Sequence, residues 1–334
     1  MDLDSHSAYR NRDSLYLSEG YNKCEDSVND GNGVISSGVI EFAPLAISSV
    51  CSRLYRQNSP AMDFSETLCL VRGGGDLATG VIHRLHLAGF PLMVTELEQP
   101  RVVRRMASVA EAVYSGEIRI GSLLARRMSL DEAKRGGWTT ARPAADSAVA
   151  VIADPDGELL RVLRPAVLID ARMAKRALDT DCSQAPLVIA LGPGFEAGRD
   201  CHAIVETKRG HDLGRVLWSG AAERNTGEPE AVLGHGTERV LRAPCEGVLH
   251  AVRDIGDRVA PDELLASVGD IPVRAPFAGV LRGLLHDGLR VQRGEKIGDV
   301  DPRGDARYCF SVSDKALAVG GGVLEAVLTW LTRN

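Results

Sequence analysis

The sequence predicts an α/β fold, with a Rossmann-like parallel sheet followed by a β-rich sandwich that contains an internal two-fold repeat. Three observations lead to this prediction. A buried strand runs into a glycine-rich turn and a helix at residues 68–88, apolar runs alternate with a helix-like segment between residues 148 and 191, and a repeated motif follows Gly234. Alternating strands and helices are typical of a parallel sheet that helices cover on both faces.

Size and composition narrow the function classes. A chain of 334 residues has room for two domains. Its formal net charge of -6 and pI of about 5.8 favour a small-molecule or protein partner over nucleic acid or a membrane surface. The seven cysteines form no C-x-x-C pair, so we expect neither disulfides nor a metal site. Because no long apolar run or export signal occurs, we expect a cytoplasmic protein without a membrane span.

We expect four segments along the chain. Residues 1–61 are rich in Ser, Asn, Asp and Gly and have no sustained period, which predicts a disordered N-terminal extension. Residues 62–235 form the expected Rossmann-like domain, and residues 236–304 form the repeated sandwich. Residues 305–334 contain a glycine-rich loop and a helix.

A β-α-β unit opens the predicted Rossmann-like domain. Leu68–Val71 is a short apolar strand, and Leu77–Leu87 carries apolar residues at helical spacing. Gly89 ends this helix, and Pro91–Thr95 is a second buried strand. Further strands are expected at residues 148–153, 166–170 and 187–191. A helix is expected at Ala171–Leu178, and an insert or further helices at residues 116–137. Spacing alone leaves the strand order open.

The loop before the first helix matches the G-x-G-x-x-G/A motif through Gly73, Gly75 and Ala78. The first glycine makes the tight turn, the second lets a pyrophosphate approach the backbone, and the helix N-terminus supplies N–H donors. Glu96 follows the second strand at a distance suited to bonding a ribose hydroxyl. The alternative is a turn without a ligand, since Asp76 disfavours a nearby phosphate unless it caps the helix.

A second glycine loop contains Gly192 and Gly194 and follows the strand at residues 187–191. We expect both glycine loops to line one cleft at the carboxyl ends of the strands. Arg209 and Arg215 could bind phosphate or carboxylate there, and His211 could move a proton. The alternative is a solvated charged loop.

Residues 242–270 repeat as residues 274–302, at an offset of 32 and with 11 identities over 29 positions. Each half has one apolar face that the other must cover, which predicts a pseudo-twofold sandwich of the biotinyl/lipoyl kind. Such carriers hold their cofactor on a lysine at the turn between the halves. That turn falls near Val268–Ile271, and no lysine occurs between Lys208 and Lys296. We therefore expect a structural or docking module.

The C-terminal segment offers weaker signals. Gly320–Gly322 precede an expected helix at Val323–Leu331, where they could form an anion-binding N-terminus or allow flexible helix packing. Cys309 could be a thiolate nucleophile or ligand, but a buried small apolar residue is the alternative. His211 and Cys309 are thus weak catalytic candidates, and the sequence leaves open whether the chain is an enzyme.

From about Met62 onward, several motifs resemble the YqeB-like accessory family of selenium-dependent molybdenum hydroxylases. These motifs are Arg72–Gly80, Thr95–Pro100, Leu191–Phe195, Val205–His211, Gly298–Arg303 and Ser313–Lys315. The resemblance implies a cytoplasmic factor in molybdenum cofactor maturation, with a molybdenum hydroxylase or its maturation proteins as partners. It implies no catalytic residue. The chain departs from the family at Gly74, where alanine is common, and in the segment 1–61, for which the resemblance implies a misassigned start instead of a disordered extension.

Three functions follow as hypotheses. The main one is an accessory protein whose Rossmann-like domain binds a pyrophosphate-bearing ligand, such as molybdopterin or its cytosine dinucleotide. The second is an NAD(P)-dependent oxidoreductase, favoured by Gly73, Gly75, Ala78 and Glu96. The third is a structural adaptor without a ligand.

Overall fold

The computed structural model describes residues 63–136, 147–174, 176, 178–224 and 231–333. The chain divides into one unit from Met1 to Pro60 and another from Ala61 to Asn334. All elements below belong to the second unit. The predicted extension at residues 1–61 lies outside the described residues.

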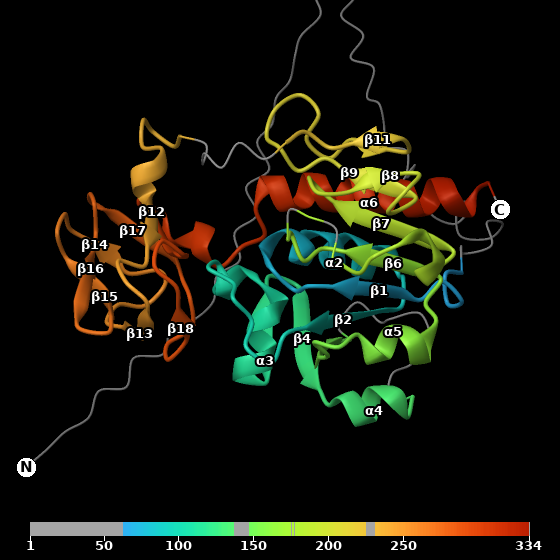
Figure 1. Ribbon diagram of the computed structural model, residues 1–334, viewed down its shortest axis with the longest axis horizontal. Coiled ribbons are helices and arrows are strands. Elements are labelled where there is room, and N and C mark those ends of the chain that lie inside the picture. The colour runs from blue at the N-terminus through green and yellow to red at the C-terminus, as the bar shows by residue number, and fades with distance from the viewer. Residues whose placement is uncertain (1–62, 137–146, 175, 177, 225–230, 334) are drawn as a thin grey trace, which may run out of the picture. The chain divides into compact units, whose positions relative to one another are not determined.

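A nine-stranded sheet forms the first part of this unit (Figure 1). Seven of its strands run parallel, and six of these lie in the order β5-β2-β1-β6-β7-β9. They are β1 (Cys69–Arg72), β2 (Leu92–Glu96), β5 (Val149–Ala153), β6 (Val167–Asp170), β7 (Leu187–Leu191) and β9 (Ala203–Val205). Parallel β4 (Leu123–Met128) and the antiparallel edge strands β3 (Glu117–Ile120) and β10 (Val216–Leu217) complete the sheet. The strands predicted from the sequence are confirmed to within one residue at each end.

Helices cover both faces of this sheet. They are α2 (Asp76–Ala88), α4 (Leu130–Lys134), α5 (Glu158–Leu163) and α6 (Asp314–Leu331). Cys69 and Val71 of β1 share one core with α2 and α6, whereas Leu70 shares another with Leu159 of α5 and Ala133 of α4. Successive strand residues point to opposite faces of the sheet, and both faces are covered. The residues of β1 before Arg72 are therefore all apolar. The predicted α/β class is confirmed.

Helices α2 and α6 approach each other so closely that glycine is required at their contact. A Cβ atom at Gly80 would clash with the backbone of Ala316, and one at Gly320 would clash with the carbonyl oxygen of Gly80. A Cβ at Gly322 would clash with the carbonyl oxygen of Gly214. These glycines lie inside helices despite their low helix propensity, because side chains would hold the backbones apart.

The glycine loop expected before a helix at Val323 is not present. Helix α6 begins at Asp314 instead, and the hydroxyl of its N-cap Ser313 accepts a hydrogen bond from Ala316 N–H at 3.2 Å. Gly320–Gly322 therefore lie within the helix, where they cannot form an anion-binding N-terminus. Gly320 and Gly322 instead pack closely against neighbouring backbone, whereas a Cβ at Gly321 would meet nothing within 4 Å.

Two other segments test the helices expected from the sequence. The described residues of the expected helix Ala171–Leu178 are not helical: Met173 has a φ of 56°, in the left-handed region, which ends any right-handed helix. The neighbouring Arg172 turns back to form an ion pair with Asp170 at 2.6 Å. Residues 116–136, where an insert or further helices are expected, contain the hairpin of β3 and β4 and the short helix α4.

Two four-stranded antiparallel sheets follow. The first contains β12 (Val240–Arg242), β19 (Lys296–Asp301), β17 (Gly279–Leu284) and β14 (Arg258–Val259). The second contains β16 (Ile271–Arg274), β15 (Leu264–Val268), β13 (Gly247–Ala251) and β18 (Arg290–Val291). We call residues 240–301 the β-module. The offset of the sequence repeat maps the starts of β13, β14 and β15 onto those of β17, β18 and β19, so the sequence repeat is also a repeat of strands.

The two halves of the β-module interleave, because each sheet takes strands from both halves. Residues related by the offset of the repeat therefore occupy one common core. The pairs are Leu249 with Leu281, Val259 with Val291, and Val268 with Val300, all of them buried. Neither half can bury its apolar face alone.

The remaining elements are short. They are α3 (Ala112–Ser115), β8 (Glu196–Ala197), β11 (Gly220–Ala221), η1 (Arg105–Ala107), η2 (Val109–Glu111), η3 (Cys182–Gln184), η4 (Thr237–Arg239) and η5 (Ala306–Cys309). No helix among the described residues has the length and apolar character needed to cross a membrane.

We predict that Gly320→Ala lowers the free energy of unfolding by about 2–3 kcal/mol, because its methyl group would force α6 away from Gly80. Gly321→Ala is the matched control, since its methyl group meets no atom within 4 Å. The control should be neutral or raise stability by about 0.5–1 kcal/mol through better helix propensity. Urea unfolding of both variants measures the difference. Equal stabilities would contradict the packing constraint.

Candidate functional site

A cavity of about 800 Å³ lies at the carboxyl ends of the parallel strands β1, β2, β5 and β6. The glycine loop after β1 forms one wall. Residues 95–97 and 101–104 after β2, residues 154–155 after β5 and residues 171–174 after β6 also line it. Lys296 of the β-module completes the lining. In open parallel sheets, ligands bind at this edge.

The two glycines of the motif have different structural reasons. Gly73 has a φ of 95°, and a Cβ there would lie 3.0 Å from the carbonyl oxygen of Ala171. Gly75 has an ordinary φ of -65° and a ψ of -178°. The nearest atom to a Cβ at Gly75 would be Val102 Cγ2, 4.0 Å away. Backbone geometry and packing thus require glycine at Gly73 but not at Gly75, whose missing side chain leaves open space in the cavity.

Three residues beside this space have N–H groups without an acceptor among the described residues. Gly75 is the N-cap of α2, and no described residue accepts a hydrogen bond from the N–H of Gly75, Asp76 or Ala78. All three residues line the cavity. Because the N-terminal end of a helix also carries a partial positive charge, this wall of the cavity suits an anion.

The carboxylate of Glu96 holds the glycine loop in place. It accepts the N–H of Gly74 at 2.8 Å through Oε2 and the N–H of Leu97 at 2.8 Å through Oε1. Burial raises the pKa of Glu96, and these two backbone donors partly offset that effect. Glu96 also lines the cavity, so it lies where a ribose-binding acid is expected. Its role toward a ligand stays a prediction.

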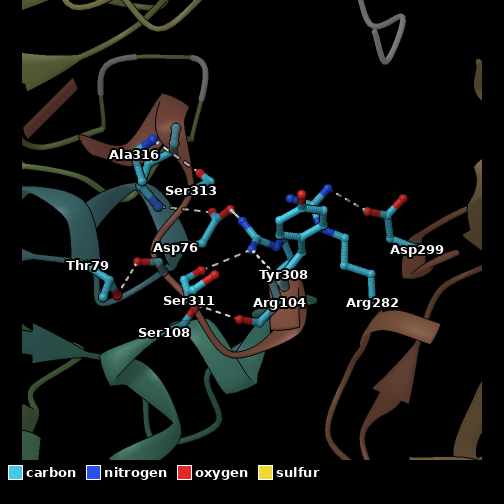
Figure 2. Close-up of polar contacts among 12 residues, drawn as sticks. Asp76, Thr79, Arg104, Ser108, Arg282, Asp299, Tyr308, Ser311, Ser313 and Ala316 are labelled. Atoms are coloured by element: carbon cyan, nitrogen blue, oxygen red, sulfur yellow. Dashed lines mark hydrogen bonds and ion pairs between the residues drawn. The ribbon is translucent and has the colours of Figure 1, made fainter. Parts of the chain in front are cut away.

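Further contacts hold the start of α2. Thr79 Oγ1 donates to the carbonyl oxygen of Gly75 at 2.9 Å and accepts the N–H of Val109 at 3.0 Å. Arg104 Nη1 pairs with Asp76 Oδ2 at 3.0 Å, while Arg104 Nη2 donates to the carbonyl oxygen of Tyr308 at 3.0 Å (Figure 2). Asp76 is therefore charge-compensated and does not by itself exclude a phosphate.

The other arginines of the cavity also have carboxylate partners. Arg72 pairs with Asp179 at 2.6 Å, and Arg172 pairs with Asp179 at 2.7 Å as well as with Asp170. Arg101 pairs with Glu295 of the β-module at 2.6 Å. Although burial raises the pKa of Asp179, hydrogen bonds and charges from Arg72 and Arg172 lower it to about 2.

The second glycine loop lies elsewhere. Gly192, Gly194, Arg209, His211 and Arg215 do not line the cavity. Gly192 has a φ of 67° and packs against Thr207, so a turn accounts for it. Arg209 pairs with Asp314 at the start of α6 at 2.7 Å, Arg215 pairs with Asp212 at 2.8 Å, and His211 is exposed. The expectation that both glycine loops line one cleft is thus not met by this cavity.

Cys309 lies in the core of the β-module, where it is 1% exposed. Burial raises the pKa of its thiol to about 11, so the thiolate is disfavoured. This environment fits the alternative of a small buried residue. Among the described residues, no group of three or more His, Cys, Asp or Glu side chains could hold a metal ion.

Sequence reasoning missed all the cations that line the cavity, which are Arg72, Arg101, Arg104, Arg172 and Lys296. Arg104 and Lys296 belong to no motif, and only the folding of the chain brings them to the cavity. Arg72, in contrast, directly precedes Gly73, and its position at the end of an apolar strand is a signal that the sequence contains.

We predict that Asp179→Asn lowers the free energy of unfolding at pH 7 by about 1–2 kcal/mol, because it leaves buried Arg72 without a carboxylate. The loss stays below that of a fully buried pair since Asp179 is 57% exposed. The folded pKa of Asp179 is depressed, so its contribution is present above about pH 4 and is lost as the pH falls toward 2.

Urea unfolding at pH 7 and at pH 3 measures this difference. Asp212→Asn, which removes an exposed pair with Arg215, is the control and should cost less than about 0.5 kcal/mol. A difference between wild type and Asp179→Asn that did not shrink at low pH would contradict the assignment.

The chain is similar to an uncharacterized bacterial protein, although no protein-family model matches it. It is 45% identical to the uncharacterized protein YqeB of Escherichia coli K12 over 270 residues, which cover 80% of this chain and 49% of YqeB. Product-bound EutE (DoeB) of Ruegeria pomeroyi aligns at 14% identity with a TM-score of 0.22, over 70% of this chain and 84% of that one. A succinylglutamate desuccinylase/aspartoacylase of Rhodobacter sphaeroides aligns at 15% identity with a TM-score of 0.23. This alignment covers 72% of this chain and 87% of that one.

These TM-scores are too low to assign a fold or an activity. The similarity to YqeB is high over the matched residues, but the chain spans about half the length of that relative. The similarity to YqeB covers four fifths of this chain.

Proposed function

We propose that the cavity binds a pyrophosphate-bearing ligand against the N-terminus of α2. The observation that carries this proposal is the open space at Gly75, where neither the backbone nor any neighbour requires glycine. A phosphate approaching the backbone there would meet the unpaired N–H groups of Gly75, Asp76 and Ala78. A side chain at Gly75 would occupy the same space.

The strand order supports a Rossmann-like interpretation of the sheet. Six neighbouring strands of the seven parallel ones, β1, β2, β5, β6, β7 and β9, have the spatial order 3-2-1-4-5-6 of dinucleotide-binding folds when they are numbered in chain order. The seventh parallel strand, β4, extends the sheet beyond β5. Strand β1 pairs with β2 on one side and with β6 on the other, so the strand order reverses there. The cavity lies outside the carboxyl ends of these strands, where such folds bind nucleotides.

We further propose that the ligand is a molybdopterin-type cofactor and that the chain serves the maturation of a molybdenum hydroxylase in the cytoplasm. Molybdopterin cytosine dinucleotide contains the pyrophosphate that the cavity wall suits. This setting is supported by the sequence motifs alone, since the name of YqeB carries no activity. The role is binding and transfer, with the hydroxylase or its maturation proteins as partners.

The β-module has features of a biotinyl/lipoyl-like sandwich, because two interleaved halves share one core. In that arrangement the β15–β16 hairpin, where Val268 pairs with Ile271, is the position of a carrier lysine. The hairpin turn contains Gly269 and Asp270 and no lysine. We therefore propose a docking or structural role for the β-module.

Two alternatives compete with this proposal. An NAD(P)-dependent oxidoreductase is favoured by the position of Glu96 at the end of β2, beside the cavity. However, His211 does not line the cavity and Cys309 is buried in the β-module, so neither supplies a proton-transfer group there. A structural adaptor would leave the cavity without a ligand.

We predict that Gly75→Val abolishes ligand binding, because its side chain would occupy the open space of the cavity. The free energy of unfolding should fall by only about 1 kcal/mol, because the backbone angles at Gly75 are ordinary and no atom lies close. Gly73→Val is the control for folding. It should cost about 2 kcal/mol or more, since its φ is 95° and Ala171 lies close. Calorimetric titration with NAD(P)H, CTP and molybdopterin-type ligands, together with thermal melting, measures both effects.

The identity of the ligand decides between the hypotheses. Mass spectrometry of ligand released from gently purified protein should detect a pterin. A nicotinamide would support the oxidoreductase instead. If Gly75→Val keeps wild-type affinity for whichever ligand binds, the loop only turns the chain and the proposal fails.

A further inference from the structure

We propose that Lys296 of the β-module is a phosphate-binding residue of this cavity, so that the ligand is held between the N-terminus of α2 and strand β19. This inference rests on the proposed function and adds a specific cation to the site. It also makes the β-module part of the binding site rather than an appended domain.

The first support is the position of Lys296. Every other residue that lines the cavity falls between Arg72 and Leu178, within the part of the chain that builds the parallel sheet up to β6 and the segment after it. Lys296 is the first residue of β19 and comes from the repeated strands of the β-module. Its side chain is accessible, so a ligand in the cavity can reach the ammonium group.

The second support is the charge balance of the lining. Arg72, Arg101, Arg104 and Arg172 each form an ion pair with a carboxylate. The Lys296 side chain forms no ion pair or hydrogen bond with any residue that the structure describes, although its backbone pairs with Arg242 of β12. It is therefore the one cation among the described lining residues whose charge is left for a ligand.

The surroundings of Lys296 point in the same direction. Desolvation by neighbouring protein groups and the charges of Arg239 and Arg282 lower the pKa of Lys296, while the charges of Asp299 and Asp76 raise it. Lys296 and Asp76 both line the cavity, so the ammonium group belongs to the same site as the start of α2. Because the ammonium group has no ion-pair partner among the described residues, its positive charge suits an anionic ligand.

Contacts around β19 hold Lys296 in place. The neighbouring Glu295 accepts two hydrogen bonds from Arg101, at 2.6 Å and 2.9 Å. A Cβ at Gly283 of β17, which pairs with β19, would lie 2.7 Å from Val103 Cγ1. The β-module therefore packs directly against residues 101–104, which line the cavity.

The chemistry of a pyrophosphate explains why both sides are needed. The N-terminus of α2 offers N–H donors and about half a positive charge, which is less than a pyrophosphate requires. A lysine supplies a full point charge on a flexible stem that can follow the phosphate. Charge-assisted hydrogen bonds of this kind are about twice as strong as neutral ones.

Titration with inorganic pyrophosphate tests the assignment. Lys296→Gln should weaken pyrophosphate binding about tenfold or more and reduce its dependence on salt, while Lys296→Arg should restore much of the affinity. Arg293→Gln is the matched control, because Arg293 is exposed, lies close to Lys296 in the sequence and does not line the cavity. This control removes the same charge and should bind as wild type does.

A labelling experiment on the unmutated protein gives an independent readout. Lysines are acetylated with and without pyrophosphate, and each site is quantified by peptide mass spectrometry. Pyrophosphate should protect Lys296 but not Lys134 or Lys208, which pair with Glu158 and Glu223 away from the cavity.

The outcomes separate the two proposals. If Gly75→Val abolishes binding while Lys296→Gln binds as wild type does and Lys296 is not protected, the inference about Lys296 is wrong and the proposed function stands. If wild type binds neither pyrophosphate nor CTP, the proposed function fails and this inference fails with it. Weakened binding in Lys296→Gln together with protection of Lys296 supports both.

Discussion

The close contact of α2 with α6 is the constraint on which the site depends. Backbone atoms of Gly80 meet those of Ala316 and Gly320, so no side chain can intervene. This contact fixes the axis of α2, and with it the direction in which the N–H groups after Gly75 point. It also brings the start of α6 beside the glycine loop, although the two segments lie far apart in the chain.

Charge pairing then sets the character of the cavity. The guanidinium of Arg104 connects Asp76 of α2 with the backbone of residues 308 and 311 before α6, and its side chain is only 10% exposed (Figure 2). Buried charges of this kind stabilise a structure only when their partners are present. Because the arginines of the described lining have such partners, Lys296 is left as the cation that distinguishes this cavity.

Local sequence patterns predict where helices and strands lie, but they predict the tertiary contacts of these elements less well. The strand, glycine turn, helix and second strand at residues 68–96 agree with the prediction to within one residue at each end, because apolar periodicity and glycine punctuation are local signals. The helix expected at Ala171–Leu178 is wrong since ion pairs of Arg172 and the left-handed Met173 override helix propensity. The anion-binding alternative for Gly320–Gly322 is also wrong. The backbone segments that require glycine there, at Gly80 and Gly214, lie far from α6 in the sequence.

The sequence by itself determined the α/β class, the β-α-β unit around Gly73 and Gly75, and the internal repeat of the β-module. These features follow from residue spacing within short segments, which any alignment of the chain with itself reveals. Only the tertiary structure decided that the loop at Gly192 lies outside the cavity, that neither the backbone nor packing requires glycine at Gly75, and that Lys296 lines the cavity. The physical reason is that burial and charge compensation depend on which distant segments come into contact. Residue spacing along the chain does not predict these contacts.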